Sequence, residues 1–293
     1  MRGSKSVLVI GSLLVLGAAG CGSSSAAKGG GTTPVHVIET AYQTTENAKT
    51  ADVAFNESIE ATSSSGSDES EHVTGSGQLD LAHQNFDISV NSPSGGAIKE
   101  LEAGGILYIQ VPPADASSVP GNKPWESIDL NQVDQAKLGK SFSQLSSLNS
   151  ENPAQALSNL ATVSDGVNKV GPDTIGGVAT TQYKAEIDLS KVAAQAQAKD
   201  GAKAANSVSQ AQQALGTSTI PVTVWVDSNG LVRQISEQTP VPAASAGAGN
   251  RSGKATVTMT FSNYGAPVQL TPPASSQVAD VTPQALQQAK GAG

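Results

Sequence analysis

Residues 222–235 read VTVWVDSNGLVRQI, and this stretch indicates the fold class of the chain. Apolar and polar residues alternate on both sides of Ser228-Asn229-Gly230, a pattern typical of two strands that each bury one face. Asn-Gly favours the left-handed backbone of a tight turn, so the stretch predicts an antiparallel hairpin of Ile220–Val226 and Leu231–Ser236. We therefore expect a sheet in which neighbouring strands follow one another along the chain.

Similar alternating segments recur throughout the sequence. Strands are predicted at Ala51–Thr62, Val73–Leu81, Phe86–Val90, Ile98–Ala103, Ile106–Val111, Trp125–Leu130, Val163–Val170, Val178–Leu189 and Ala255–Phe261. Gly104-Gly105 separates two of them as a second tight hairpin. The sequence thus predicts an α+β fold with one large antiparallel sheet of about eleven strands and helices packed on one face.

Helical patterns are fewer. Pro34, preceded by two threonines that can cap a helix, predicts the first one. Apolar spacing predicts helices at Asn131–Leu148 and Asn152–Leu160. The Ala/Gln-rich segment Ser190–Leu215 predicts a helix pair with a break near Asp200-Gly201. This pair is either a plain solvated element, or a lid or docking surface.

The first 33 residues predict an export signal and a tether. Residues 1–21 (MRGSKSVLVIGSLLVLGAAGC) have a basic start, an apolar run from Val7 to Leu16 and small residues before Cys21. A membrane span needs about 20 apolar residues, more than this run supplies. We expect a signal peptide at 1–20, an acylated cysteine and Gly/Ser-rich tether at 21–33, one folded domain at 34–273 and a disordered tail at 274–293.

Composition disfavours several function classes. The formal net charge is −8 and the isoelectric point is near 4.9, without a basic stripe, so nucleic-acid binding is not expected. A single cysteine excludes a disulfide within the chain and a zinc site with several thiolates. Neither an H-E-x-x-H motif nor a G-x-S-x-G elbow occurs, so we expect no enzyme, no cofactor and no metal site. The acidic run Asp68–His72 is predicted to be a solvated hairpin loop, with a calcium site as the alternative.

Three segments carry a family resemblance when they are taken in order. They are PWESIDL (residues 124–130), IGGVATTQYKAEIDL (175–189) and VTVWVDSNGLVRQI (222–235), preceded by the lipobox-like Ala18-Ala19-Gly20-Cys21. Together they resemble the LppX/LprG-type lipoproteins of actinobacteria, which are related in fold to the LolA carriers. The resemblance implies a half-barrel sheet closed by helices, with the acyl chains of a lipid or glycolipid held between them. It also implies that Cys21 is acylated and anchors the protein on the extracytoplasmic side of the cell membrane, with an envelope transporter as a candidate partner.

Alternation along the strands gives candidate lipid-contacting residues on the inner face of this sheet. They are Val53, Phe55, Ile59, Leu79, Leu81, Phe86, Ile88, Val90, Val224, Val226, Val257, Met259 and Phe261. An apolar space lined by such residues would receive acyl chains, and the same residues would equally form a dry packed core. Glu57 interrupts this apolar face on its strand. Trp225 lies on the opposite face from Val224 and Val226, as a structural anchor or at a lipid-facing rim.

The expected function is therefore that of a membrane-anchored carrier that moves a lipid or glycolipid within or across the cell envelope. The alternative is an envelope sensor that uses the same domain to bind a protein partner.

Overall fold

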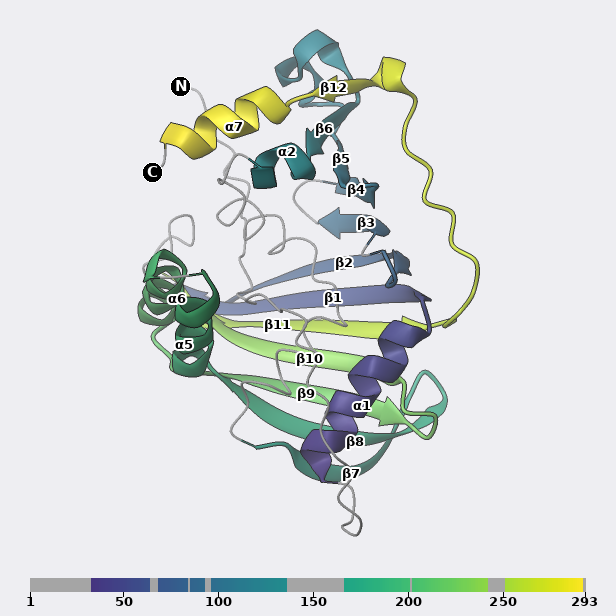
Figure 1. Ribbon diagram of the computed structural model, residues 1–293, viewed down its shortest axis with the longest axis vertical. Coiled ribbons are helices and arrows are strands. Elements are labelled where there is room, and N and C mark those ends of the chain that lie inside the picture. The colour runs from purple at the N-terminus through teal and green to yellow at the C-terminus, as the bar shows by residue number, and fades with distance from the viewer. Residues whose placement is uncertain are drawn as a thin grey trace.

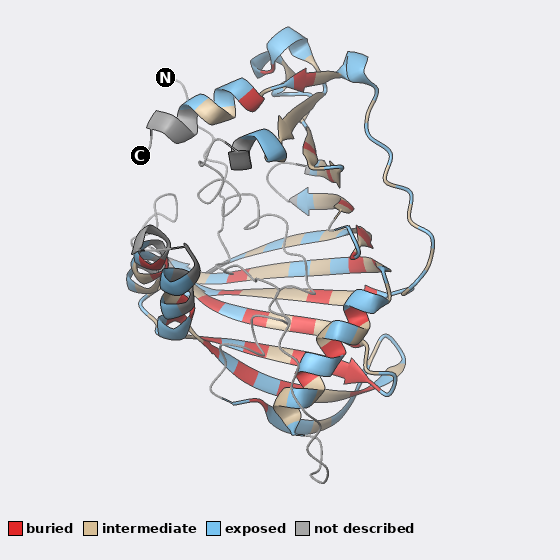
Figure 2. Ribbon diagram, viewed as in Figure 1, coloured by how far each residue is buried: buried red, intermediate tan, exposed pale blue. Residues whose placement is uncertain are grey.

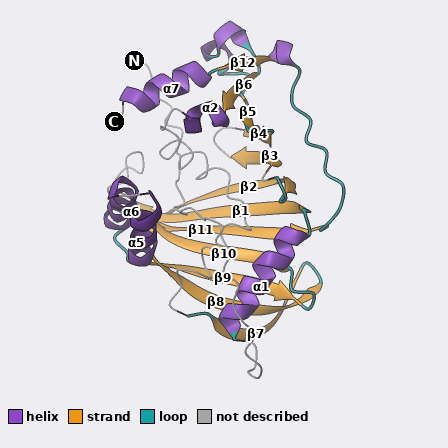
Figure 3. Ribbon diagram, in the orientation of Figure 1, coloured by secondary structure: helices purple, strands orange, loops and turns teal. Residues whose placement is uncertain are grey.

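The computed structural model describes residues 33–63, 68–83, 85–92, 96–135, 166–200, 202–241 and 251–291. The predicted signal peptide, Cys21, the tether before Thr33 and the predicted helix Asn152–Leu160 lie outside the described residues. The elements are, in order, α1 (Pro34–Asn47), β1 (Thr50–Ser63), β2 (Asp68–Asp80), β3 (Asn85–Ser92), β4 (Gly96–Ala103), β5 (Ile106–Gln110), η1 (Ala116–Ser118), η2 (Pro120–Asn122), β6 (Trp125–Asp129), α2 (Leu130–Gln135), β7 (Asn168–Ile175), β8 (Val178–Asp188), α5 (Leu189–Asp200), α6 (Ala202–Leu215), β9 (Thr219–Asp227), β10 (Val232–Val241), β11 (Arg251–Ser262), η3 (Ser275–Gln277), β12 (Val278–Asp280) and α7 (Thr282–Gly291) (Figure 3).

The strands of the described chain form one open sheet, in the order β12-β6-β5-β4-β3-β2-β1-β11-β10-β9-β8-β7 (Figure 1). Consecutive strands pair as antiparallel hairpins along most of it, which confirms the prediction of one large antiparallel sheet. Both predicted tight hairpins occur: β4–β5 turns at Gly104-Gly105, and β9–β10 turns at Asn229-Gly230. Gly104 and Gly105 have φ values of 63° and 78°, a left-handed backbone that glycine adopts without steric cost.

Where a disordered tail was predicted at 274–293, the described residues up to 291 form η3, β12 and α7. Strand β12 pairs with the edge strand β6 in parallel, and α7 follows it. The buried Thr282, at the start of α7, accepts a hydrogen bond through its Oγ1 from the backbone N–H of Asp129 (2.9 Å). The folded domain therefore continues past the predicted boundary at 273, and the sheet has twelve strands rather than eleven.

Three smaller predictions also need correction. The helix predicted at Asn131–Leu148 begins one residue earlier, as α2, and only its part up to Gln135 is described. The strand predicted at Val163–Val170 is instead Asn168–Ile175 in the described residues, since the sheet edge tolerates Pro172, which cannot donate to a ladder. The acidic run Asp68–His72 is the beginning of strand β2 and not a hairpin loop.

The sheet has an apolar face, called here the inner face, and a polar outer face. On the inner face, one core cluster joins the strands to Ile38 and Ala41 of α1, Val192 of α5 and Val208 of α6. In Figure 1, α1 crosses β8–β10 toward one end of these strands, and α5 and α6 stand at the opposite end. The outer face carries cross-strand polar contacts, such as that between the hydroxyls of Ser236 and Thr258 (3.2 Å).

Candidate functional site

Most of the apolar residues predicted for the inner face belong to its core. Those in the core cluster are Val53, Leu79, Leu81, Phe86, Val224, Val226, Met259 and Phe261. Phe55, Ile88 and Val257 pack against this cluster and remain half-buried. Ile59 is buried and Val90 is half-buried, and both share the inner face by strand register. The alternation in the sequence therefore identified the correct face of these strands.

Burial along the inner face is uneven. Side chains near α1 are almost completely buried, with 2% exposure for Val224 and 3% for Phe261. Figure 2 shows many of the buried positions on β8–β11, and α1 adds Ile38, Ala41 and Thr45. A second set of inner-face apolar side chains, on β11 and on β1–β5, stays half-buried, and we call this set the open apolar patch. Its members are Phe55, Val73, Ile88, Val90, Ile98, Ile109 and Val257.

Strand β2 contributes two inner-face glycines to the middle of this patch. Gly75 lies opposite Phe55 on one side and Val90 on the other, and Gly77 lies between Val53 and Ile88. A Cβ on Gly75 would come within 2.1 Å of Cε1 in the Phe55 ring. The ring therefore occupies the space over β2 that a larger side chain would need.

Among the carboxyl groups that interrupt the apolar inner face are Glu57 on β1, Glu100 and Glu102 on β4, and Glu237 on β10. Burial raises the pKa of all four, that of Glu102 to about 6 and that of Glu237 to about 7. The nearby carboxylate of Glu71 further raises the pKa of Glu57. Glu237 is 5% exposed, and its Oε1 has no hydrogen-bond partner among the described residues.

Of these groups, the sequence indicated only Glu57, as an interruption of an apolar face. The predicted strand Leu231–Ser236 ended one residue before Glu237, since the alternation of apolar residues stops there. In β4 the apolar residues Ile98 and Leu101 lie on opposite faces, so its sequence does not show which face Glu100 and Glu102 share.

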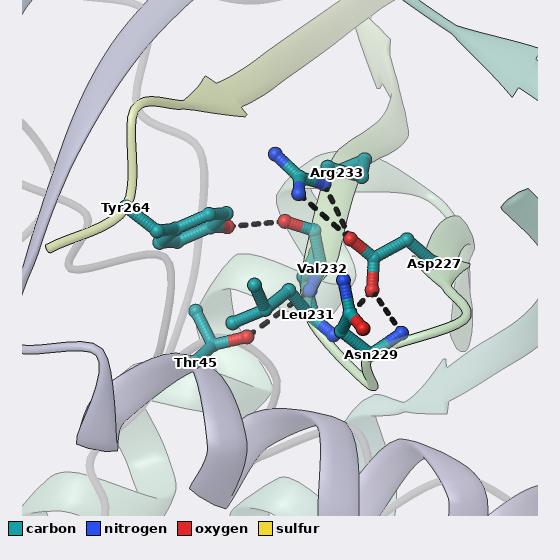
Figure 4. A network of polar contacts seen from close by, with 7 residues as sticks. All are labelled: Thr45, Asp227, Asn229, Leu231, Val232, Arg233 and Tyr264. Atoms are coloured by element: carbon teal, nitrogen blue, oxygen red, sulfur yellow. Dashed lines mark hydrogen bonds and ion pairs between the residues drawn. The ribbon is translucent and has the colours of Figure 1, made fainter. Parts of the chain in front are cut away.

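A polar network holds α1 against the start of β10 (Figure 4). The buried Thr45 of α1 accepts a hydrogen bond through its Oγ1 from the backbone N–H of Val232 (3.1 Å). The hydroxyl of Tyr264 donates to the carbonyl oxygen of Val232. Burial raises the pKa of Tyr264, so its hydroxyl keeps this proton. The backbone of one buried residue is thus bonded from two separate segments.

Asp227 organises the adjacent hairpin. Its Oδ1 accepts from the backbone N–H groups of Asn229 (2.8 Å) and Leu231 (3.0 Å), and its Oδ2 pairs with the guanidinium of Arg233 (2.7 Å). The guanidinium carbon also lies 5.2 Å from the centroid of the Tyr264 ring. These contacts are internal to the fold, so the network positions α1 and leaves no group unpaired for chemistry.

Trp225 lies on the outer face, as its alternation with Val224 and Val226 predicted. It is 8% exposed, and its Nε1–H donates to Oδ2 of Asp173 on β7 (2.8 Å). This bond lowers the pKa of Asp173. The indole therefore anchors the outer face of the sheet and does not rim the inner one.

Within the described ranges, no helix is long and apolar enough to cross a membrane. The same residues contain no group of three or more His, Cys, Asp or Glu side chains that could hold a metal ion.

No protein-family model matches this chain, and no curated protein matches it. Among solved structures it is similar to the lipoprotein LppX from Mycobacterium tuberculosis, with 13% identity and a TM-score of 0.46 over 81% of this chain and 98% of that one. It is also similar to LprF from Mycobacterium bovis, with 14% identity and a TM-score of 0.41 over 84% of this chain and 100% of that one. A LolA-superfamily protein from Nitrosomonas europaea has 9% identity and a TM-score of 0.28, over 83% and 99% of the two chains. These neighbours are of the kinds that the sequence resemblance named, and the likeness concerns the fold alone.

Proposed function

We propose that this chain is a membrane-anchored lipoprotein that binds the acyl chains of a lipid or glycolipid against the open apolar patch. The observation that supports this is the half-buried state of Phe55, Ile88, Val90 and Val257, which share one face of an open sheet. Apolar side chains that stay partly accessible together on one face of a sheet can serve as a site for an apolar partner. An acyl chain matches it because a flexible chain can follow a row of side chains along several strands.

The proposed activity is sequestration, with no covalent bond made or broken. Each methylene that leaves water contributes about 0.8 kcal/mol, so roughly a dozen carbons supply about 10 kcal/mol. That is comparable to the cost of association, about 4–15 kcal/mol, so two-chain lipids should bind more tightly than single-chain ones. Movement of the bound lipid within or across the envelope is the role in which such a site would act.

The central test is lipid extraction and mass spectrometry on protein purified from its own host, with two matched variants. Val90→Asn places an amide on the inner face, within the open apolar patch. Ser89→Asn places the same group on the outer face of the same strand. We expect acyl lipid with the natural chain and with Ser89→Asn, and at least a fivefold loss with Val90→Asn. Absence of lipid from the natural chain, or equal lipid in both variants, would contradict the proposal.

Membrane anchoring has its own test at Cys21, which lies outside the described residues. Cys21→Ser removes the thiol that acylation requires, so the protein should move from the membrane to the soluble fraction of the cell envelope. Retention of the variant in salt-washed membranes would refute a lipid anchor at this position.

A further inference from the structure

Two inner-face carboxyl groups flank a single apolar residue in the middle of the sheet. Val257 of β11 lies opposite Glu57 of β1 on one side and opposite Glu237 of β10 on the other. With neighbouring strands about 4.8 Å apart, the two glutamate Cα atoms are about 10 Å from each other. Glu71 lies opposite Ile59, diagonally beside Glu57. All these residues belong to the inner face by strand register.

Glu237 lacks the partners that the chain gives to another buried carboxylate. Asp227 is held by the guanidinium of Arg233 and two backbone N–H groups. Glu237 is buried to a similar degree, yet its Oε1 receives no hydrogen bond from any described residue. A buried acceptor without a donor is costly, and this one lies on the face that bears the open apolar patch. It therefore fits a donor group supplied by a ligand.

The charge of the inner face points to the same kind of ligand. Arg233, which lies at the bulge of β10 beside Val232, is already paired with Asp227. The other charged residues at inner register positions of β1–β6 and β8–β10 with a described side chain are glutamates. These are Glu57, Glu71, Glu100, Glu102, Glu126 and Glu237. Strand β11 has a basic residue, Arg251, at an inner register position, opposite Ser63 and about 20 Å along the strand from Val257. The edge strand β7 has the exposed Lys169 at an inner register position.

We propose that these carboxyl groups bind the head group of an amphiphile that donates hydrogen bonds, an ammonium or a hydroxylated group, and exclude anionic head groups. The apolar tail would lie on the open apolar patch while the head donates to Glu237 and Glu57. An anion at the same place would meet these acidic groups and be repelled by those that are ionised. Burial raises the pKa of Glu237 to about 7, and a carboxyl group that keeps its proton still has acceptor capacity for a hydrogen bond. The inference rests on the proposed lipid binding and specifies which lipids are accepted.

Three amphiphiles with the same dodecyl tail test this proposal: dodecylammonium, dodecyl maltoside and dodecyl phosphate. Calorimetric titration below their critical micelle concentrations, at pH 8, measures each affinity for the purified protein. We expect dodecylammonium or dodecyl maltoside to bind at least tenfold more tightly than dodecyl phosphate. Preference for the ammonium would identify a cationic head group as the natural donor, and preference for the maltoside would identify a hydroxylated one.

Variants separate head-group recognition from tail binding. Glu237→Gln and Glu57→Gln, each checked for folding by circular dichroism, should lower the preference over dodecyl phosphate at least fivefold. Glu60→Gln is the matched control, because Glu60 is exposed on the outer face of β1 and pairs with Lys254 (3.2 Å). Binding of all three amphiphiles with similar affinity would overturn this inference and leave lipid binding intact. Failure of all three to bind would count against the proposed function itself.

Discussion

Replacement of Glu237 by glutamine should make the protein more stable at alkaline pH, because the buried carboxyl is costly to ionise. Burial raises its pKa from the ordinary 4.5 to about 7. The folded state thus binds the proton more tightly than the unfolded state does. This contribution to stability is complete below pH 4.5 and is lost as the pH rises through about 7. The difference between the two pKa values, at about 1.4 kcal/mol for each pH unit, corresponds to about 3 kcal/mol.

Urea unfolding of the lipid-free protein at pH 5, 6, 7 and 8 measures this effect. Glutamine keeps the size and polarity of the side chain and cannot ionise. Between pH 5 and 8, the free energy of unfolding of Glu237→Gln should therefore rise by about 2–3 kcal/mol relative to that of the natural chain. The outer-face variant Glu60→Gln provides the baseline, because its carboxylate is exposed and should show no comparable trend. A difference that stays constant with pH, or that changes in the opposite direction, would refute the burial argument for Glu237.

Two further predictions concern packing and the attachment of α1. Gly75→Val on β2 would displace the Phe55 ring, since even a Cβ at position 75 comes within 2.1 Å of it. We expect the free energy of unfolding to fall by about 1–3 kcal/mol. An unchanged urea midpoint would show that the ring is not held there. Thr45→Val removes the acceptor of the buried Val232 N–H and should cost about 1–3 kcal/mol in the same assay, whereas Thr40→Val, on the exposed side of the same helix, should cost little. Equal effects of the two threonine variants would contradict the role assigned to Thr45.

The hairpins could be predicted from sequence because their turn residues carry their own conformational preference. Gly104-Gly105 and Asn229-Gly230 favour the backbone of a tight turn whatever the rest of the chain does. The pairing of β1 with β11 has no such local signal. It joins Asp52 to Ser262, two residues far apart in sequence, and depends on burial of the whole inner face. The order of the hairpins in the sheet was therefore beyond the reach of local patterns.

The edges of the sheet were predicted least well, for a related physical reason. Alternation of apolar and polar residues arises where one face of a strand is buried, and both edge strands lack it. In β7 most residues are exposed, and Pro172 suggests a loop when it is considered alone. β12 has only three residues, Val278–Asp280, too few to show a period. Each of these strands pairs through its backbone with a neighbouring strand, and such pairing requires no particular pattern of residues.

The inner-face glutamates show what a broken pattern can mean. Alternation located this face correctly, and the same alternation makes Glu57 and Glu237 conspicuous, because an apolar residue at either position would avoid the cost of burying a carboxyl group. If glutamine at position 237 is more stable at alkaline pH, as we expect, folding alone does not account for the glutamate. Conflicts between a local residue and its surroundings are expected at functional sites, where stability is given up for recognition. The unpartnered Oε1 of Glu237 is such a conflict, and a donor on a bound ligand would resolve it.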